Sequence, residues 1–234
     1  MFIHEIFKNA DPKRLAMTGE SNITYGQLEK AVENYRNTLY AMGIRRGDTV
    51  GLYTANRAEF VYVYMAVVSL GAIIVPINNS LVDREVDFIL RDAESKLLIS
   101  DMPLTVSVPC IDIHDLDYRA STENAPKAPA FPEDLTEDDV CALIYTSGTT
   151  GSPKGAMITH KNQVRNVEQY TSVVPFNPED KVLCVLPMFH CYGLTTVVLG
   201  SLYHHSTIVI LRSKSPTEII NTIMKYSVTI AIMV

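Results

Sequence analysis

The sequence predicts an α/β fold in which largely parallel sheets are layered with helices. Short apolar runs alternate with longer segments whose apolar residues recur at helical spacing, which is the rhythm of a parallel α/β protein. With 47% hydrophobic and 20% charged residues, the composition is that of an ordinary globular chain. A chain of 234 residues is also long enough to bury a large core.

The N-terminal part predicts a hairpin followed by a capped helix. A short helix is expected near residues 4–9, and the strand-like runs 14–18 and 22–24 are joined by a turn that contains glycine. Thr24 and Gln27 then form the capping-box pattern that opens a helix, and a later glycine ends it. The apolar positions on the buried face of this helix are Leu28, Val32, Tyr35, Leu39 and Met42.

Strands and helices then alternate through the first half of the chain. The helix expected at residues 57–70 is apolar on most faces, so it should be buried between layers. The acidic segment 115–139 contains three prolines and is interpreted as an exposed connection. In chain order the alternating elements are strand 49–53, helix 57–70, strand 72–75, helix 83–93 and strand 96–100.

The second half continues this alternation after an apolar run at 141–145. The expected elements are an extended piece at 156–159, a helix with Val164, Val167, Thr171 and Val174 on one face, strand 181–186, helix 187–203, strand 206–211 and a helix from Pro216. This last helix is expected to bury Ile219, Ile220, Ile223 and Met224. The final run, 227–234, is interpreted as a central strand that stops without turn, cap or tail, which indicates a cut in the sequence.

The loop after the strand at 141–145 has the chemistry of an anion site. Its glycines allow a tightly turned backbone in which consecutive amides point inward, and it adds hydroxyls and one lysine but no carboxylate. Amides, hydroxyls and an ammonium all donate hydrogen bonds, so phosphate oxygens fit such a site. The candidate phosphate-binding residues are Thr146, Ser147, Gly148, Thr149, Thr150, Gly151 and Lys154.

Two other interpretations of this loop fit less well. The Walker pattern requires a lysine directly after its second glycine, whereas Gly151 is followed by Ser-Pro-Lys-Gly, so a Walker NTPase is disfavoured. An ordinary surface loop rich in glycine and hydroxyls does not account for so many specified residues directly behind a strand.

The run Thr146-Ser-Gly-Thr-Thr-Gly-Ser-Pro-Lys-Gly155 resembles the signature of the adenylate-forming superfamily, which includes acyl-CoA synthetases, adenylation domains of peptide synthetases, and luciferases. The resemblance implies that residues 1–234 are the N-terminal part of the large domain of that fold, with the rest of the large domain and the mobile C-terminal domain absent. It implies an acid-thiol ligase that joins a carboxylic acid, fatty acids foremost, to ATP as an acyl-adenylate and passes the acyl group to coenzyme A. ATP, Mg²⁺ and coenzyme A are the implied cofactors. The loop would hold the β- and γ-phosphates, and Thr146 would lie near the magnesium.

Two further stretches resemble motifs of the same superfamily. Leu186-Pro-Met-Phe-His-Cys-Tyr-Gly193 resembles its second motif, which implies that His190 contacts the substrate carboxylate or the α-phosphate region and that Gly193 allows a close approach. A helix-capping or packed core histidine is the alternative for His190. The stretch from Ser69 to Asn78 resembles a structural segment of the family, and we assign it to core packing.

Composition and termini exclude several classes of protein. A net charge of −6 and a pI near 5.5 argue against a nucleic-acid surface. The longest apolar stretch is interrupted too early for a membrane span, and the first residues lack the pattern of a signal peptide, so a cytoplasmic location is expected. The cysteines have no metal-ligand spacing and are expected to be free and mostly buried: Cys110, Cys141, Cys184 and Cys191.

The resemblance also places the family's remaining functional groups beyond residue 234. These are the adenine-binding aromatic motif, the acidic magnesium ligand, the ribose-binding aspartate and a distal lysine. The fragment by itself is therefore expected to be inactive, and its terminal strand to leave an apolar edge through which copies self-associate. Two alternatives stay open: a noncatalytic unit that binds phosphate or nucleotide, and an adenylation domain that loads another thiol acceptor.

Overall fold

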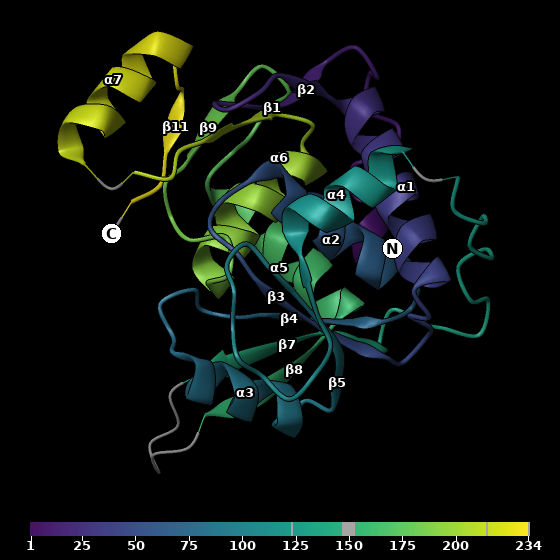
Figure 1. Ribbon diagram of the computed structural model, residues 1–234. Coiled ribbons are helices and arrows are strands. Elements are labelled where there is room, and N and C mark those ends of the chain that lie inside the picture. The colour runs from purple at the N-terminus through teal and green to yellow at the C-terminus, as the bar shows by residue number, and fades with distance from the viewer. Residues whose placement is uncertain (123, 147–152, 214, 234) are drawn as a thin grey trace.

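The computed structural model describes residues 1–122, 124–146, 153–213 and 215–233. Two sheets lie above one another in Figure 1 with helices between and around them, so the expected α/β architecture is confirmed. No helix in these ranges is long and apolar enough to cross a membrane. The helices are η1 (Ile3–Glu5, 3-10), α1 (Tyr25–Ala41), α2 (Ala58–Ser69), α3 (Asp83–Asp92), α4 (Ile113–Thr122), α5 (His160–Val173), η2 (Gly193–Leu199, π), α6 (Gly200–Tyr203) and α7 (Pro216–Tyr226).

The lower sheet in Figure 1 has six strands, and all neighbouring pairs except the last run parallel. The exception is the hairpin that joins β7 to β8, which is antiparallel. Helix α3 packs on the outer face of this sheet against Tyr53, Val75 and Leu98. In spatial order the strands are β6 (Cys110–Asp112), β5 (Ser95–Ser100), β3 (Thr49–Tyr53), β4 (Ile73–Pro76), β7 (Val140–Thr146) and β8 (Lys154–Thr159).

The upper sheet has five strands, and it combines the two ends of the chain. Met17 near the N-terminus pairs with Ile208, in parallel, and only the hairpin partner of that first strand runs antiparallel. Helix α7 packs on the outer face through Ile219 and Ile223. In spatial order the strands are β11 (Ile230–Ala231), β9 (Lys181–Cys184), β10 (Thr207–Ile210), β1 (Leu15–Thr18) and β2 (Ile23–Thr24).

The main core lies between the two sheets, around α2. All residues of α2 except Glu59 are buried, as the apolar sequence of this helix predicts. The hydrophobic cluster that contains α2 also holds Val50 and Leu52 of the lower sheet and Val182 and Ile208 of the upper sheet. The two sheets are therefore joined through one continuous apolar layer.

The local signals at the N-terminal helix are confirmed in detail. The Thr24 hydroxyl accepts a hydrogen bond from the Gln27 amide at 3.2 Å, and the Gln27 side chain accepts one from the Thr24 amide at 2.8 Å. Each partner thus satisfies a backbone donor that the first turn of a helix leaves open. Strand β3 spans residues 49–53, as the sequence predicts.

The interpretation of residues 115–139 as an exposed connection is wrong for its first part. Helix α4 extends to Thr122, and it buries Ile113, Leu116 and Ala120, which lie three, four and seven positions apart. The Tyr35 hydroxyl on α1 donates to Asp117 at 2.8 Å and ties the helix down. Asp115 is exposed whereas Asp117 faces α1, and the acidic composition of the segment as a whole concealed the apolar stripe of this helix. Strand β6, which precedes α4, was not expected either.

Three expectations for the second half also need correction. The helix expected from Pro187 begins after a turn in which the His190 amide donates to the Pro187 carbonyl at 3.1 Å, and residues 193–199 form a π-helix. Ile220 and Met224 on α7 are 57% and 74% exposed rather than buried. The final run forms only the short strand β11, two residues long, which pairs with β9 at the edge of the described sheet.

The four cysteines are free, as expected from their spacing. Cys141 and Cys184 are buried in strands, and burial raises the pKa of both thiols to about 12. Cys110 and Cys191 are exposed, so the expectation that most of the cysteines are buried holds for only two of them.

Candidate functional site

The carboxyl ends of the parallel strands meet at one side of the molecule. Residues that follow β3, β4, β9 and β10 line a common pocket of about 80 Å³, so the strand ends of both sheets face the same space. Open α/β sheets bind ligands outside the carboxyl ends of their strands. The residues that line the pocket are Ala55, Asn56, Asn79, Ser80, Val185, Pro187, Phe189 and Arg212.

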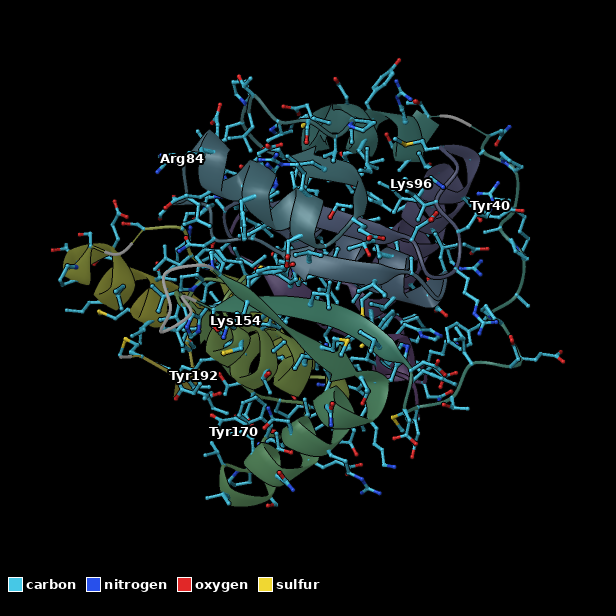
Figure 2. The ribbon with its side chains drawn as sticks, turned by 90° about the horizontal axis from the view of Figure 1, so that it is seen from below. Tyr40, Arg84, Lys96, Lys154, Tyr170 and Tyr192 are labelled. Carbon is cyan, nitrogen blue, oxygen red and sulfur yellow. The ribbon has the colours of Figure 1, made fainter. Side chains whose placement is uncertain are left out.

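The ends of the predicted phosphate loop lie at this same edge of the lower sheet. Thr146 is the last residue of β7 and Lys154 the first of β8, and the two are partners in the antiparallel register. Both are exposed. In Figure 2 Lys154 lies on the same side of the molecule as Tyr192, and Lys96, at the amino end of β5, lies toward the other side. The other predicted phosphate-binding residues lie outside the described residues: Ser147, Gly148, Thr149, Thr150 and Gly151.

Tyr145 fixes the base of this hairpin. Its hydroxyl donates to the Asp92 carboxylate at 2.6 Å, and burial together with this carboxylate raises the pKa of the phenol. A Cβ atom on Gly155 would lie 2.9 Å from the tyrosine ring, closer than side-chain packing allows. A side chain at position 155 would thus displace the end of the Tyr145 ring, and the hairpin is anchored to α3 just before the loop begins.

The donor set at the hairpin ends fits a phosphate group and an associated cation. The Thr146 hydroxyl can donate to a phosphate oxygen or accept a metal, and the Lys154 ammonium supplies a positive charge beside it. Among the described residues no cluster of three or more histidine, cysteine, aspartate or glutamate side chains is arranged to hold a metal ion.

His190 is exposed, and it caps the start of the helix that follows it. Its Nδ1 accepts a hydrogen bond from the Tyr192 amide at 3.2 Å, and its carbonyl accepts one from the Leu194 amide at 2.9 Å. In this arrangement Nδ1 carries no proton, so the hydrogen of the neutral ring is on Nε2. The alternative of a packed core histidine is excluded by the exposure, whereas the capping role coexists with a ring that a ligand can reach.

Gly193 has a packing role. A Cβ atom at this position would lie 2.4 Å from the Pro187 carbonyl oxygen, which is shorter than any non-bonded contact allows. Gly193 is buried, and the close approach that the sequence predicts is made by the chain itself, between the first turn of the helix and the turn before it. Its assignment to substrate binding stays a prediction.

Sequence reasoning missed two residues of the pocket, Asn56 and Arg212. The Asn56 side chain is buried and bonds the segment that leads from β9 to His190, while the Arg212 Nε donates to the Asn56 carbonyl at 3.0 Å. Arg212 also pairs with Glu20 at 2.7 Å. The sequence did contain a signal for Asn56, which is a polar residue between an apolar strand and an apolar helix. A polar side chain in such a buried position needs hydrogen-bond partners.

Comparison with known proteins agrees with this geometry. The sequence model of the family described as AMP-binding enzyme matches residues 5–234. A probable CoA ligase, CCL5, of Humulus lupulus is 34% identical over 237 residues, which cover 92% of this chain and 42% of the relative. The long-chain-fatty-acid–CoA ligase FadD13 of Mycobacterium tuberculosis is 34% identical over 194 residues, which cover 77% of this chain and 38% of the relative. The chain thus spans about two fifths of the length of these relatives.

Solved structures agree as well. The N-terminal domain of FACL13 from Mycobacterium tuberculosis superposes with a TM-score of 0.89 at 29% identity, covering 98% of this chain and 62% of that one. The O-succinylbenzoate coenzyme A synthetase MenE of Bacillus subtilis, in complex with ATP and magnesium, gives 0.85 at 27% identity with coverages of 98% and 62%. The chain belongs to the AMP-binding enzyme family, and its fold is that of the N-terminal portion of the adenylate-forming enzymes.

Proposed function

We propose that this chain is the N-terminal part of an ATP-dependent acyl-CoA ligase, which activates a carboxylic acid as its acyl-adenylate and transfers the acyl group to coenzyme A. The observation that carries the proposal is the position of Thr146 and Lys154 at facing ends of one hairpin, at the carboxyl edge of the sheet. They flank a sequence with the family signature. The turn that bears His190 follows β9, whose end lines the pocket at the same side.

In this proposal the hairpin holds the leaving group of the adenylation step. Attack of a carboxylate on the α-phosphorus of ATP releases pyrophosphate, and the enzyme must hold the polyphosphate while its charge develops. The residues assigned to the nucleotide are Thr146, Ser147, Gly148, Thr149, Thr150, Gly151 and Lys154, with Thr146 also near Mg²⁺. The anchoring of Tyr145 to α3 supports this role, because it fixes the strand from which the loop departs.

His190 is assigned to the acid substrate. His190 is exposed beside the strand ends, and because Nδ1 accepts from the Tyr192 amide, Nε2–H is left as a donor for a ligand. Such a donor can bond a carboxylate oxygen or an oxygen of the α-phosphate. Gly193 contributes by allowing the turn before His190 to pack closely on the helix.

The acid is a fatty acid in our proposal, supported by the similarity to a long-chain-fatty-acid–CoA ligase. Relatives described as acting on other acids include 4-coumarate–CoA ligase 3 of Arabidopsis thaliana, which is 31% identical. A decisive experiment is ATP–pyrophosphate exchange by the complete protein with fatty, aromatic and amino acids in parallel. Exchange with fatty acids, followed by acyl-CoA formation, supports the proposal. Exchange with amino acids and transfer to a carrier-protein thiol would favour an adenylation domain instead.

The 234-residue chain by itself is expected to bind phosphate or nucleotide at most. It spans about two fifths of its relatives, and the proposed roles cover only polyphosphate and acid contacts. A sequence extension beyond Val234 that contains an acidic Tyr-Gly-x-Thr-Glu motif and a distal lysine would support the ligase. Acyl-adenylate formation by residues 1–234 alone would show that the further groups are not needed.

A further inference from the structure

We infer that Asn56 is the positioning residue for His190, acting from the other sheet through the turn that bears the histidine. The inference rests on the proposed function only for what His190 does, because the contacts that hold the turn are independent of any ligand. Asn56 follows β3 in the lower sheet, and the turn follows β9 in the upper sheet. The residue is only 8% exposed.

The amide side chain of Asn56 bonds the turn on both sides. Its Oδ1 accepts from the Met188 amide at 2.8 Å, and its Nδ2 donates to the Leu186 carbonyl at 2.9 Å and to the Cys184 carbonyl at 3.3 Å. Three of its four hydrogen-bonding positions are thus used on one five-residue segment of the chain. No apolar side chain could replace it without leaving buried backbone groups unpaired.

These bonds reach His190 through the next turn of the chain. Pro187 lies between Leu186 and Met188, which Asn56 bonds, and the Pro187 carbonyl accepts a hydrogen bond from the His190 amide at 3.1 Å. The same carbonyl limits the space at Gly193, so the helix start packs against it. The ring is then fixed by the Tyr192 amide at Nδ1. A shift at residues 186–188 is therefore transmitted to the imidazole over only a few bonds.

The backbone around Asn56 is fixed by further hydrogen bonds and ion pairs. The Ala55 amide donates to Asp101 at 2.9 Å, and the Arg212 guanidinium donates to the Asn56 carbonyl. Arg57, which is buried, pairs with Glu59 at 2.9 Å and lies 3.8 Å from Asp101. Because the backbone on both sides of Asn56 is fixed in this way, its side chain provides a rigid reference for the turn.

The experiment compares Asn56→Ala with Gln163→Ala in the complete protein. Gln163 is also a buried amide that links two elements, through Tyr64 at 2.6 Å, but it lies away from the turn. Amide hydrogen exchange is measured at Met188 and at Tyr192. We expect Asn56→Ala to accelerate exchange at both sites, including Tyr192, whose acceptor is His190 and not Asn56. Gln163→Ala should change neither. Unchanged protection of Tyr192 in Asn56→Ala would overturn the inference, and this readout does not depend on any enzymatic activity.

A kinetic cycle with His190→Ala provides the second test. Asn56→Ala should lower the turnover number of the adenylation step about 10- to 100-fold, while the KM for ATP changes less than about 2-fold, because misplacement of a contacting group affects chemistry more than nucleotide binding. In the His190→Ala background the same substitution should cost less than about 3-fold. If the fold-losses in turnover number of the two single variants multiply in the double variant, Asn56 acts independently of His190. If Asn56→Ala does not fold, Asn56→Ser is expected to give the same changes at smaller size.

Discussion

The interior around α2 and the periphery of the molecule, at the strand ends and on α7, differ in the exposure of their side chains. In α2, buried apolar side chains join the two sheets, and Met65 is fully buried among them. At the periphery, Thr146, Lys154 and His190 are exposed, and the outer face of α7 presents Met224 to solvent. The interior should therefore determine stability and the strand ends should determine activity. At the strand ends, the Asn56 side chain links the lower sheet to the segment that follows β9 in the upper sheet.

The largest effect is expected for Met65→Ala in the interior. The side chain has no exposed surface, so its truncation leaves a cavity and should lower the free energy of unfolding by about 2–5 kcal/mol. Denaturant titration measures this loss. The activity per folded molecule should stay near that of the wild type. A loss below about 1 kcal/mol would mean that the core around α2 repacks, and the contrast between the regions would be weaker than the packing indicates.

The next largest effect is the pH dependence of stability that a buried histidine of the interior causes. His160 is 2% exposed, its Nδ1 accepts from the Ile3 amide, and burial lowers its pKa to about 4. The unfolded chain binds a proton near pH 6.5 while the folded chain remains neutral, so stability is complete above pH 6.5 and declines as the pH falls toward 4. The loss from this group should reach about 3 kcal/mol. His160→Gln should flatten that part of the stability profile. An unchanged slope would show that other groups cause it, the buried His4 first, whose pKa is lowered to about 3.

Lys154→Ala should give the reverse pattern at the strand ends. Loss of one charged phosphate contact is expected to cost about 1.5–3 kcal/mol in ATP use, measured by pyrophosphate exchange. The free energy of unfolding should change by less than about 0.5 kcal/mol because the side chain is exposed. Lys96→Ala is the matched control, since Lys96 lies toward the opposite side and bonds Asp48 and the Gly43 carbonyl. A normal rate of pyrophosphate exchange in Lys154→Ala would show that this lysine does not contact the nucleotide.

The smallest effect is expected for Met224→Ala on α7. The same chemical change as in Met65→Ala should here alter the free energy of unfolding by less than about 0.5 kcal/mol, because the side chain is 74% exposed. Sedimentation of the 234-residue chain tests the separate expectation that copies self-associate through the apolar edge of the terminal strand, and Met224→Ala should leave that association unchanged. A stability loss comparable with that of Met65→Ala would mean that the face of α7 is covered in solution.

The elements that sequence reasoning predicted correctly depend on local signals. The capping box at Thr24 and the alternation around β3 are set by neighbouring residues, and the structure confirms them. The stripe of α4 was hidden because acidic residues and later prolines dominate the segment. The exposure of Ile220 depends on what packs against α7, which apolar spacing does not encode. Asn56 was missed because its partners lie about 130 positions away in the chain.

The pairing of β1 with β10 has a consequence for synthesis on the ribosome. The Thr207 hydroxyl donates to the Leu15 carbonyl across 192 positions, so the first strand has no parallel partner until β10 has been synthesised. At about 5–20 residues per second, this interval lasts roughly 10–40 s. Throughout it, the hairpin β1–β2 exposes an apolar edge that later becomes interior. The nascent chain is therefore a candidate for chaperone protection during translation, and slowing elongation should increase its aggregation.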